Sequence, residues 1–213
     1  MNTDDLISRL SADTARTPPN AALGRLLMAI CLGAAAALVA LLVVLGPRPD
    51  LAQAMGEGSF WMKAGYTGAL SLAALLTLMR VARPGGSGGA AWIAVAALPV
   101  LVFALAALEL ASAAPAARHG LMMGHSWMLC PWRILGFAAP VFVGLIWAFR
   151  RLAPTRLRLA GLAAGLTAGA VGATVYGLAC TEYAAAFLAI WYTLGMAAAG
   201  LLGALTGPRL LRW

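Results

Sequence analysis

Six uninterrupted apolar stretches, each about 20 residues long, constrain this chain more than any other feature. An α-helix rises 1.5 Å per residue, so about 20 residues cross the ~30 Å hydrocarbon core of a membrane. The stretches are continuously apolar and do not alternate as the strands of a membrane barrel do. The sequence therefore predicts an all-α, polytopic membrane protein with a bundle of six transmembrane helices. The expected spans are 26–45, 60–79, 90–111, 132–149, 159–180 and 184–206.

The composition excludes most soluble classes of protein. Of the 213 residues, 62% are hydrophobic and 10% are charged, whereas soluble domains carry about 25% charged residues. So few charges cannot cover a water-exposed surface, which argues against a soluble enzyme, a disordered protein and a direct nucleic-acid binder. The chain carries a net charge of +8. In a hydrophobic chain, an excess of basic residues is typical of the cytoplasmic ends of membrane helices.

Basic residues are unevenly divided between the two sets of loops. Eleven arginines lie in the leader, the second and fourth loops and the tail, and the opposite side holds only Arg48, Lys63, Arg118 and Arg133. Cytoplasmic loops carry the excess of Arg and Lys, so we expect both termini in the cytoplasm. The expected parts are a leader (1–24), a six-helix domain (25–206) and a short tail (207–213).

The predicted spans hold no ionisable residue near their middles. Pumps and transporters usually need such groups there, so this pattern disfavours transport. Lys63 lies near one end of its span, where we expect its amine to reach the membrane surface. Gly161, Gly165 and Gly169 form a ridge of small residues, which would either pack inside the bundle or form the seam of a homodimer.

The three cysteines fall into two classes. Cys31 lies among apolar residues of the first span, and we expect it to pack in the core. Cys130 precedes the fourth span and Cys180 closes the fifth, so the expected orientation places both thiols at the outer face. They would form a structural disulfide, a thiol or metal sensor, or a pair of inert thiols.

Other metal-binding residue types lie near these cysteines in the sequence. His119 and His125 fall in the outer-side loop 112–131, and Glu182 closely follows Cys180. Cysteine, histidine and carboxylate together bind soft or borderline divalent metals. The spacing matches no known metal signature, and a loop histidine is commonly only solvated. The candidate ligands of a transient heavy metal are Cys130, Cys180, His119, His125 and Glu182, and no permanent cofactor is expected.

The leader predicts a short amphipathic helix. Asp4 and Asp5 suit the positive end of the helix dipole, and Leu6, Ile7 and Leu10 fall on one face. A helix of about ten residues is marginal alone in water. The segment would be a frayed tail, a helix on the membrane surface, or a docking segment that folds on a cytoplasmic partner.

Several stretches together resemble the NrsF-type anti-sigma factors, which are six-span inner-membrane proteins of proteobacteria. The resemblance covers nearly the whole chain. Its most specific part is the combination of the two outer cysteines, Cys130 and Cys180, with the short leader. The stretches that carry it are Thr3–Ile7 with Leu10 and Asp13, Gly124–Trp127 leading to Cys130, Tyr176–Cys180 with Glu182, Trp191–Tyr192 with Gly195, and the end Gly207–Trp213.

The resemblance implies that the leader holds an extracytoplasmic-function (ECF) sigma factor away from RNA polymerase. It also implies that Cys130 and Cys180 are needed to sense heavy-metal or oxidative stress. Leu6, Ile7 and Leu10 would then contact the sigma factor, and the protein would not be an enzyme.

Two other functions compete with this interpretation. A membrane thiol oxidoreductase would normally need a closely spaced cysteine pair or a second pair for relay, and Cys130 and Cys180 lie far apart in the chain. A small metal transporter would need polar groups near the midplane of the membrane.

Overall fold

The computed structural model describes residues 3–12, 21–83, 85–152 and 154–212. Throughout these ranges the regular structure is helical, and six helices are long and apolar enough to cross a membrane. These are α2 (Ala21–Val44), α4 (Gly58–Val81), α5 (Ala91–Ser112), α7 (Cys130–Phe149), α8 (Leu157–Tyr176) and the continuous helical segment α9–η1–α10 (Ala185–Leu210). The predicted all-α fold class with six candidate transmembrane helices is therefore confirmed.

Shorter elements complete the fold. They are α1 (Thr3–Ala12), α3 (Leu51–Ala54) and α6 (Pro115–Met123). The last span is divided into α9 (Ala185–Phe187), the π-helical turn η1 (Leu188–Tyr192) and α10 (Thr193–Leu210). Residues 13–20 lie outside the described ranges, so α1 is described by itself.

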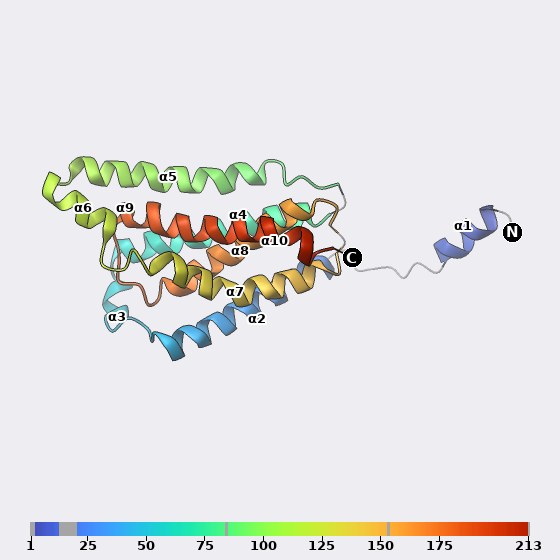
Figure 1. Ribbon diagram of the computed structural model, residues 1–213, viewed down its shortest axis with the longest axis horizontal. Coiled ribbons are helices and arrows are strands. Elements are labelled where there is room, and N and C mark those ends of the chain that lie inside the picture. The colour runs from blue at the N-terminus through green and yellow to red at the C-terminus, as the bar shows by residue number, and fades with distance from the viewer. Residues whose placement is uncertain (1–2, 13–20, 84, 153, 213) are drawn as a thin grey trace.

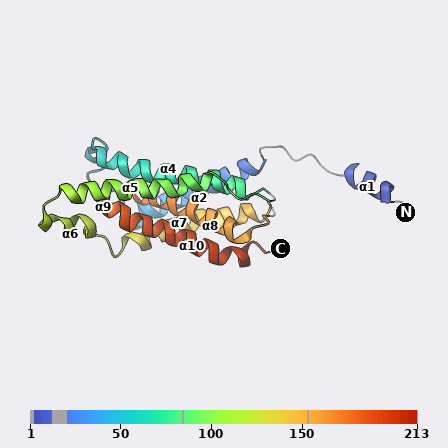
Figure 2. The same cartoon turned by 90° about the horizontal axis from the view of Figure 1, so that it is seen from above.

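The long helices run side by side along the long axis of the bundle (Figures 1 and 2). The start of α2 and the end of α10 lie at one end, which we call the terminal end. The start of α7 and the end of α8 lie at the opposite end, with Cys130 and Cys180, and we call this the cysteine end. An even number of spans requires the start of α2 and the C-terminus to emerge on one side of the membrane.

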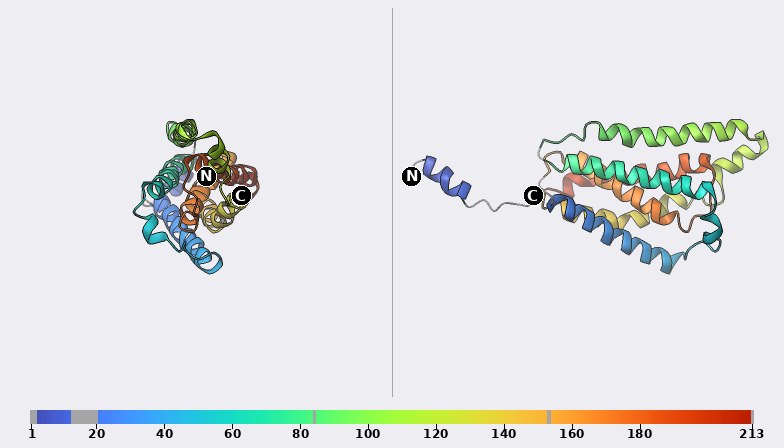
Figure 3. Two further views of the ribbon diagram at one scale, coloured as in Figure 1. Left: turned by 90° about the vertical axis from the view of Figure 1, so that its left-hand side faces the viewer. Right: turned by 180° about the vertical axis from the view of Figure 1, so that it is seen from behind.

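Helix α8 occupies the middle of the bundle (Figure 3), where it packs against α4, α7 and α10. Small residues allow this position. A Cβ atom on Gly165 would overlap the carbonyl oxygen of Ala199, and one on Gly161 would overlap that of Gly203. The glycine ridge of the fifth span therefore packs inside the bundle against α10, as one of the two sequence-based alternatives expected.

Helices α2 and α5 lie at the edges of the bundle, and most of their apolar side chains face outward. This pattern suits contact with lipid, because a helix that is apolar all round is stable at a membrane-facing surface. The expectation that Cys31 packs in the core is wrong. Its side chain is exposed on α2, and the residues that α2 buries are Leu26, Ala29, Gly33, Ala37 and Leu41.

The interior divides into two clusters of buried side chains. The cluster at the cysteine end includes Cys130, Cys180, Tyr176, Phe187 and Tyr192. The other cluster includes the side chains of Leu26, Leu78, Phe149 and Leu211. Chemistry-bearing groups are therefore concentrated in one of the two clusters, and this end is the candidate site.

Candidate functional site

Both cysteines of the site are free thiols at the edges of helices. Cys130 is the first residue of α7, and Cys180 follows the turn that ends α8. The fifth span was expected to continue to Cys180, but α8 ends at Tyr176. From there the chain turns, and the Cys180 amide donates to the Tyr176 carbonyl at 3.1 Å.

The structure brings the two thiols into one buried cluster. Cys130 is 0% exposed and Cys180 is 3% exposed, and both belong to the cluster of buried side chains at the cysteine end. The sequence correctly placed them at one end of the bundle, but contact of these thiols with the outer solution was also expected and is not observed. A reagent reaches a covered thiol only when the surrounding groups move.

Lys63 is the largest correction to the sequence-based picture of the site. Its side chain does not extend to the membrane surface but is buried, at 3% exposure. The Nζ atom donates to the carbonyl oxygen of Cys180 at 3.0 Å and lies 5.7 Å from the centre of the Tyr192 ring. An amine in such a place needs polar partners, and the carbonyl and the aromatic face supply them.

Aromatic rings surround the thiols. Tyr176 stacks between Phe137 and Tyr192, with ring centres 6.1 and 6.0 Å apart, and Phe187 packs edge-on against Tyr192. The Tyr192 hydroxyl lies beside Cys180, yet it forms no well-directed hydrogen bond with any residue that the structure describes. This is unusual, because buried hydroxyl groups are normally paired.

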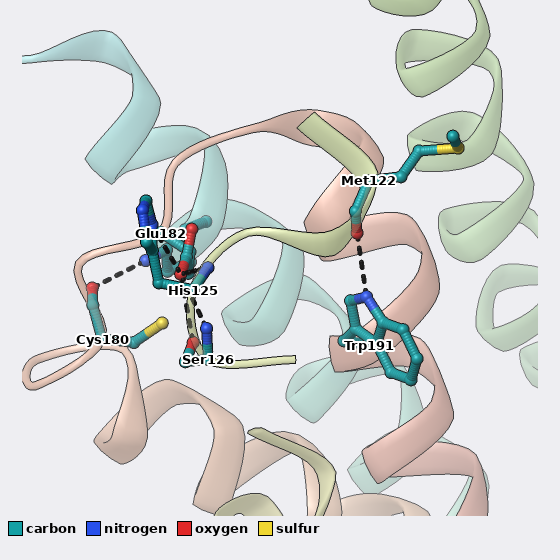
Figure 4. A network of polar contacts seen from close by, with 7 residues as sticks. Met122, His125, Ser126, Cys180, Glu182 and Trp191 are labelled. Carbon is teal, nitrogen blue, oxygen red and sulfur yellow. Dashed lines mark hydrogen bonds and ion pairs between the residues drawn. The ribbon is translucent and has the colours of Figure 1, made fainter. Parts of the chain in front are cut away.

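Glu182 points toward the loop that precedes α7 and away from bulk water (Figure 4). Its Oε1 atom accepts hydrogen bonds from the His125 amide at 2.7 Å and the Ser126 amide at 3.1 Å. The Ser126 hydroxyl donates to the same oxygen at 3.3 Å. The carboxylate therefore joins the segment that follows Cys180 to the segment that precedes Cys130.

The five candidate metal ligands do not gather around one point. The His125 side chain is exposed, with Nδ1 3.9 Å from Glu182, and His119 is exposed on α6. In the described parts of the chain, no three His, Cys, Asp or Glu side chains are grouped as a metal site requires. The thiols and Glu182 share one end of the bundle, whereas the histidine side chains face outward.

Helix α6 and its flanking loops cover the cysteine end. The indole N–H of Trp191 in η1 donates to the Met122 carbonyl in α6 at 2.9 Å (Figure 4). Glu109 accepts from the Ala186 amide at 2.8 Å, which satisfies a free N–H at the start of the last span. A cavity of about 470 Å³ lies between α6 and residues 181–184. Glu182 is among the residues that line this cavity.

The loop before α3 also contacts this end. The Arg48 amide donates to the Leu178 carbonyl at 3.2 Å, and the Arg48 guanidinium pairs with Asp50 at 2.6 Å. This hydrogen-bonded pair raises the pKa of Arg48 and lowers the pKa of Asp50. Because the Asp50 side chain is half-exposed, we expect the pair to contribute little to stability.

The leader forms the helix that its pattern predicted, from Thr3 to Ala12, with Asp4 and Asp5 in the first turn. Ile7 is exposed, whereas the side chains of Leu6 and Leu10 lie outside what the structure describes. The proposed sigma-binding face of α1 is therefore still a prediction. The structure adds the helix itself, whose apolar and polar residues are segregated.

Comparison with known proteins identifies the family. Residues 10–213 match the NrsF family, described as "Negative regulator of sigma F". The chain is 46% identical to the anti-sigma-F factor NrsF of Caulobacter vibrioides and 41% identical to a probable anti-sigma-F factor NrsF of Azospira oryzae, with both chains covered completely in each case. No solved structure matches the chain. Similarity at this level over the full length shows that the chain belongs to the NrsF family of negative regulators of sigma F.

Proposed function

We propose that this protein is a membrane-embedded anti-sigma factor that holds a sigma factor on its cytoplasmic side. The observation that carries the proposal is the full-length similarity to anti-sigma-F factors in a chain with six membrane-spanning helices. The amphipathic helix α1 lies before the first span, so it would bind the partner while the bundle anchors it. The excess of arginines on the terminal side supports a location of that side in the bacterial cytoplasm.

The finer proposal concerns the signal. The partner would be an ECF-type sigma factor, and reaction of Cys130 and Cys180 with a heavy metal or an oxidant would release it. Both thiols lie in one cluster, and a soft metal prefers such a pair to oxygen donors. No metal is required in the resting state.

Release requires a two-state mechanism. The reaction of the thiols must favour a bundle arrangement in which α1 binds the sigma factor less well. Changing a population from 99% bound to 99% released requires about 5.5 kcal/mol of differential binding. Binding of a metal to thiolates is strong enough to supply this, at about 10 kcal/mol in structural sites.

The signal is tested by measuring sigma-dependent transcription, with and without cadmium or peroxide, in single cysteine variants. Cys130→Ser and Cys180→Ser should each abolish the response, because a paired site fails when either half is lost. Cys31→Ser is the matched control, since Cys31 is exposed on α2 away from the cluster. A normal response in both paired variants would contradict the sensing role but leave the anti-sigma role intact.

The anti-sigma role is tested separately through α1. Leu6→Asp or Leu10→Asp would place a charge on the predicted docking face, and we expect constitutive sigma-dependent transcription with normal amounts of the protein in the membrane. Asp4→Asn is the control, since it changes a charge in the first turn and leaves that face apolar. Full repression after deletion of residues 2–12 would contradict docking through α1.

A further inference from the structure

Two charged side chains at the cysteine end, Lys63 and Glu182, make contacts that neither stability in lipid nor metal binding explains. Lys63 is the chain's only lysine, and it is buried in a predominantly apolar bundle. Glu182 is 9% exposed and directs one oxygen at three donors of another loop. Buried charged groups in membrane proteins are costly, and they commonly mark functional positions.

Each of these side chains makes its contact next to a cysteine. Lys63 extends from α4 and donates directly to the carbonyl of Cys180 at 3.0 Å. Glu182 lies two residues beyond Cys180 and binds the amide and hydroxyl of Ser126. The Ser126 carbonyl in turn accepts from the Cys130 amide at 2.9 Å.

These contacts form an unbroken path between the two thiol-bearing segments. The path runs from Lys63 to Cys180, on to Glu182 and Ser126, and ends at Cys130. Two of its links involve charged groups, and such hydrogen bonds are stronger than neutral ones. The Cys180 segment is an irregular connection between α8 and α9. Its backbone hydrogen bonds, such as that of the Cys180 amide to the Tyr176 carbonyl, hold it to the end of α8, whereas Lys63 and Glu182 join it to α4 and to the loop before α7.

We propose that Lys63 and Glu182 are positioning residues that hold Cys130 and Cys180 together as one reactive pair. This inference rests on the proposed role of the thiols as a paired sensor. It assigns Glu182 the role of an anchor for the loop in place of the metal ligand that its residue type suggested. When the Lys63 and Glu182 side chains are removed, both thiols remain in the protein, but they are no longer held in a fixed position relative to each other.

Gly124 supports this role for Glu182. Its backbone has a positive φ of 55°, which L-residues with a side chain rarely adopt. A Cβ atom at this position would lie 2.5 Å from Oε2 of Glu182. The loop is therefore shaped so that the carboxylate can approach its backbone closely, which gives a way to disturb the anchor without changing Glu182 itself.

The test is intramolecular cross-linking of the full-length protein in membranes, in a Cys31→Ser background. Dibromobimane links two nearby thiols and becomes fluorescent when both have reacted. N-Ethylmaleimide, applied to variants that retain only Cys130 or only Cys180, measures how readily each thiol reacts alone. We expect Lys63→Met and Glu182→Ala to lower the ratio of cross-linked to singly alkylated protein by about tenfold, the size of effect that loss of a charged hydrogen bond produces.

Conservative variants and a distant carboxylate provide the controls. Lys63→Arg keeps a cationic donor and Glu182→Gln keeps one acceptor, so both should retain more of the cross-linking than the truncated variants. Glu57→Ala removes an exposed carboxylate in the loop before α4 and should change nothing. If Glu182→Ala fails to accumulate in the membrane, Lys63→Met carries the test alone, because it removes the other anchor and leaves the Glu182 contacts in place.

Unchanged cross-linking in Lys63→Met and Glu182→Ala would overturn the proposal. So would an absence of cross-linking in the parent protein under conditions in which each thiol alone reacts with N-ethylmaleimide. So would an equal loss in the Glu57 control, because that would indicate a nonspecific effect on the fold. The readout does not involve the sigma factor. A normal transcriptional response in Cys130→Ser and Cys180→Ser would therefore refute the sensing role of the thiols. The positioning role of Lys63 and Glu182 could still be measured by cross-linking.

Discussion

At the scale of single residues, Tyr192 offers a direct test of the core at the cysteine end. Its hydroxyl is fully buried and lacks a well-directed partner among the described residues. An unsatisfied buried polar group costs about 1–3 kcal/mol. We expect Tyr192→Phe to raise the free energy of unfolding in detergent by about 1 kcal/mol, measured by SDS titration or thermal melting.

Tyr66 is the matched control for this substitution. Its hydroxyl lies 2.7 Å from the Thr193 hydroxyl, so Tyr66→Phe removes the same atom from a satisfied position. We expect Tyr66→Phe to lower the free energy of unfolding, because the loss leaves Thr193 with one partner fewer. Equal destabilisation by both variants would show that the Tyr192 hydroxyl has a partner in solution.

The residues that sequence reasoning placed wrongly share a physical cause. Apolar neighbours of Cys31 suggested a core position, but lipid is as apolar as a protein core, so the same composition suits both faces of a membrane helix. A lysine near the end of a span usually reaches water, yet Lys63 points inward. The carbonyl of Cys180 comes from the connection after α8 and the ring of Tyr192 from the last span, and only the folded bundle brings them to Lys63.

At the scale of elements, the contact between α8 and α10 depends on small residues at their crossing. A Cβ atom on Gly165 would overlap the Ala199 carbonyl and approach the Cα of Gly200 at 2.9 Å. We expect Gly165→Ala to lower the free energy of unfolding by about 1–3 kcal/mol, because the backbones must separate. The change is measurable as a lower melting temperature of the purified protein in detergent.

Gly136 in α7 is the control for the glycine substitution, since a Cβ atom there would meet nothing within 4 Å. Alanine favours helix over glycine by about 1 kcal/mol, so Gly136→Ala should be neutral or stabilising. If Gly165→Ala were equally harmless, the close approach of α8 to α10 would be wrong.

The sequence predicted the long helices and the leader helix α1 well, and the other short elements poorly. Apolar runs of membrane length leave little choice of structure, because every backbone group must be satisfied within the helix. The π-helical turn η1 and the covering helix α6 were not predicted. A π turn depends on tertiary contacts such as that of Trp191 with Met122, and α6 is short and contains mixed residue types.

At the scale of the whole molecule, α8 connects the two ends of the bundle. It contacts α4, α7 and α10; its last turn precedes Cys180, and its first turn lies at the terminal end. Close packing makes such a helix resist bending, so a displacement at one end shifts its neighbours at the other. This supports the proposal that a reaction at the thiols changes how the leader binds its partner.

The proposed mechanism requires a particular orientation in the membrane, which reporter fusions test. Fusions after Trp213 and within the turn at residues 85–89 should report a cytoplasmic location, and a fusion near Ala116 in α6 should report a periplasmic one. The expectation follows from the excess of arginines at the terminal end, because basic loops stay in the cytoplasm. A cytoplasmic signal at Ala116 with a periplasmic one at Trp213 would place the thiols on the same side as the sigma factor. Sensing across the membrane would then be wrong, whereas the packing around Cys130 and Cys180 would be unaffected.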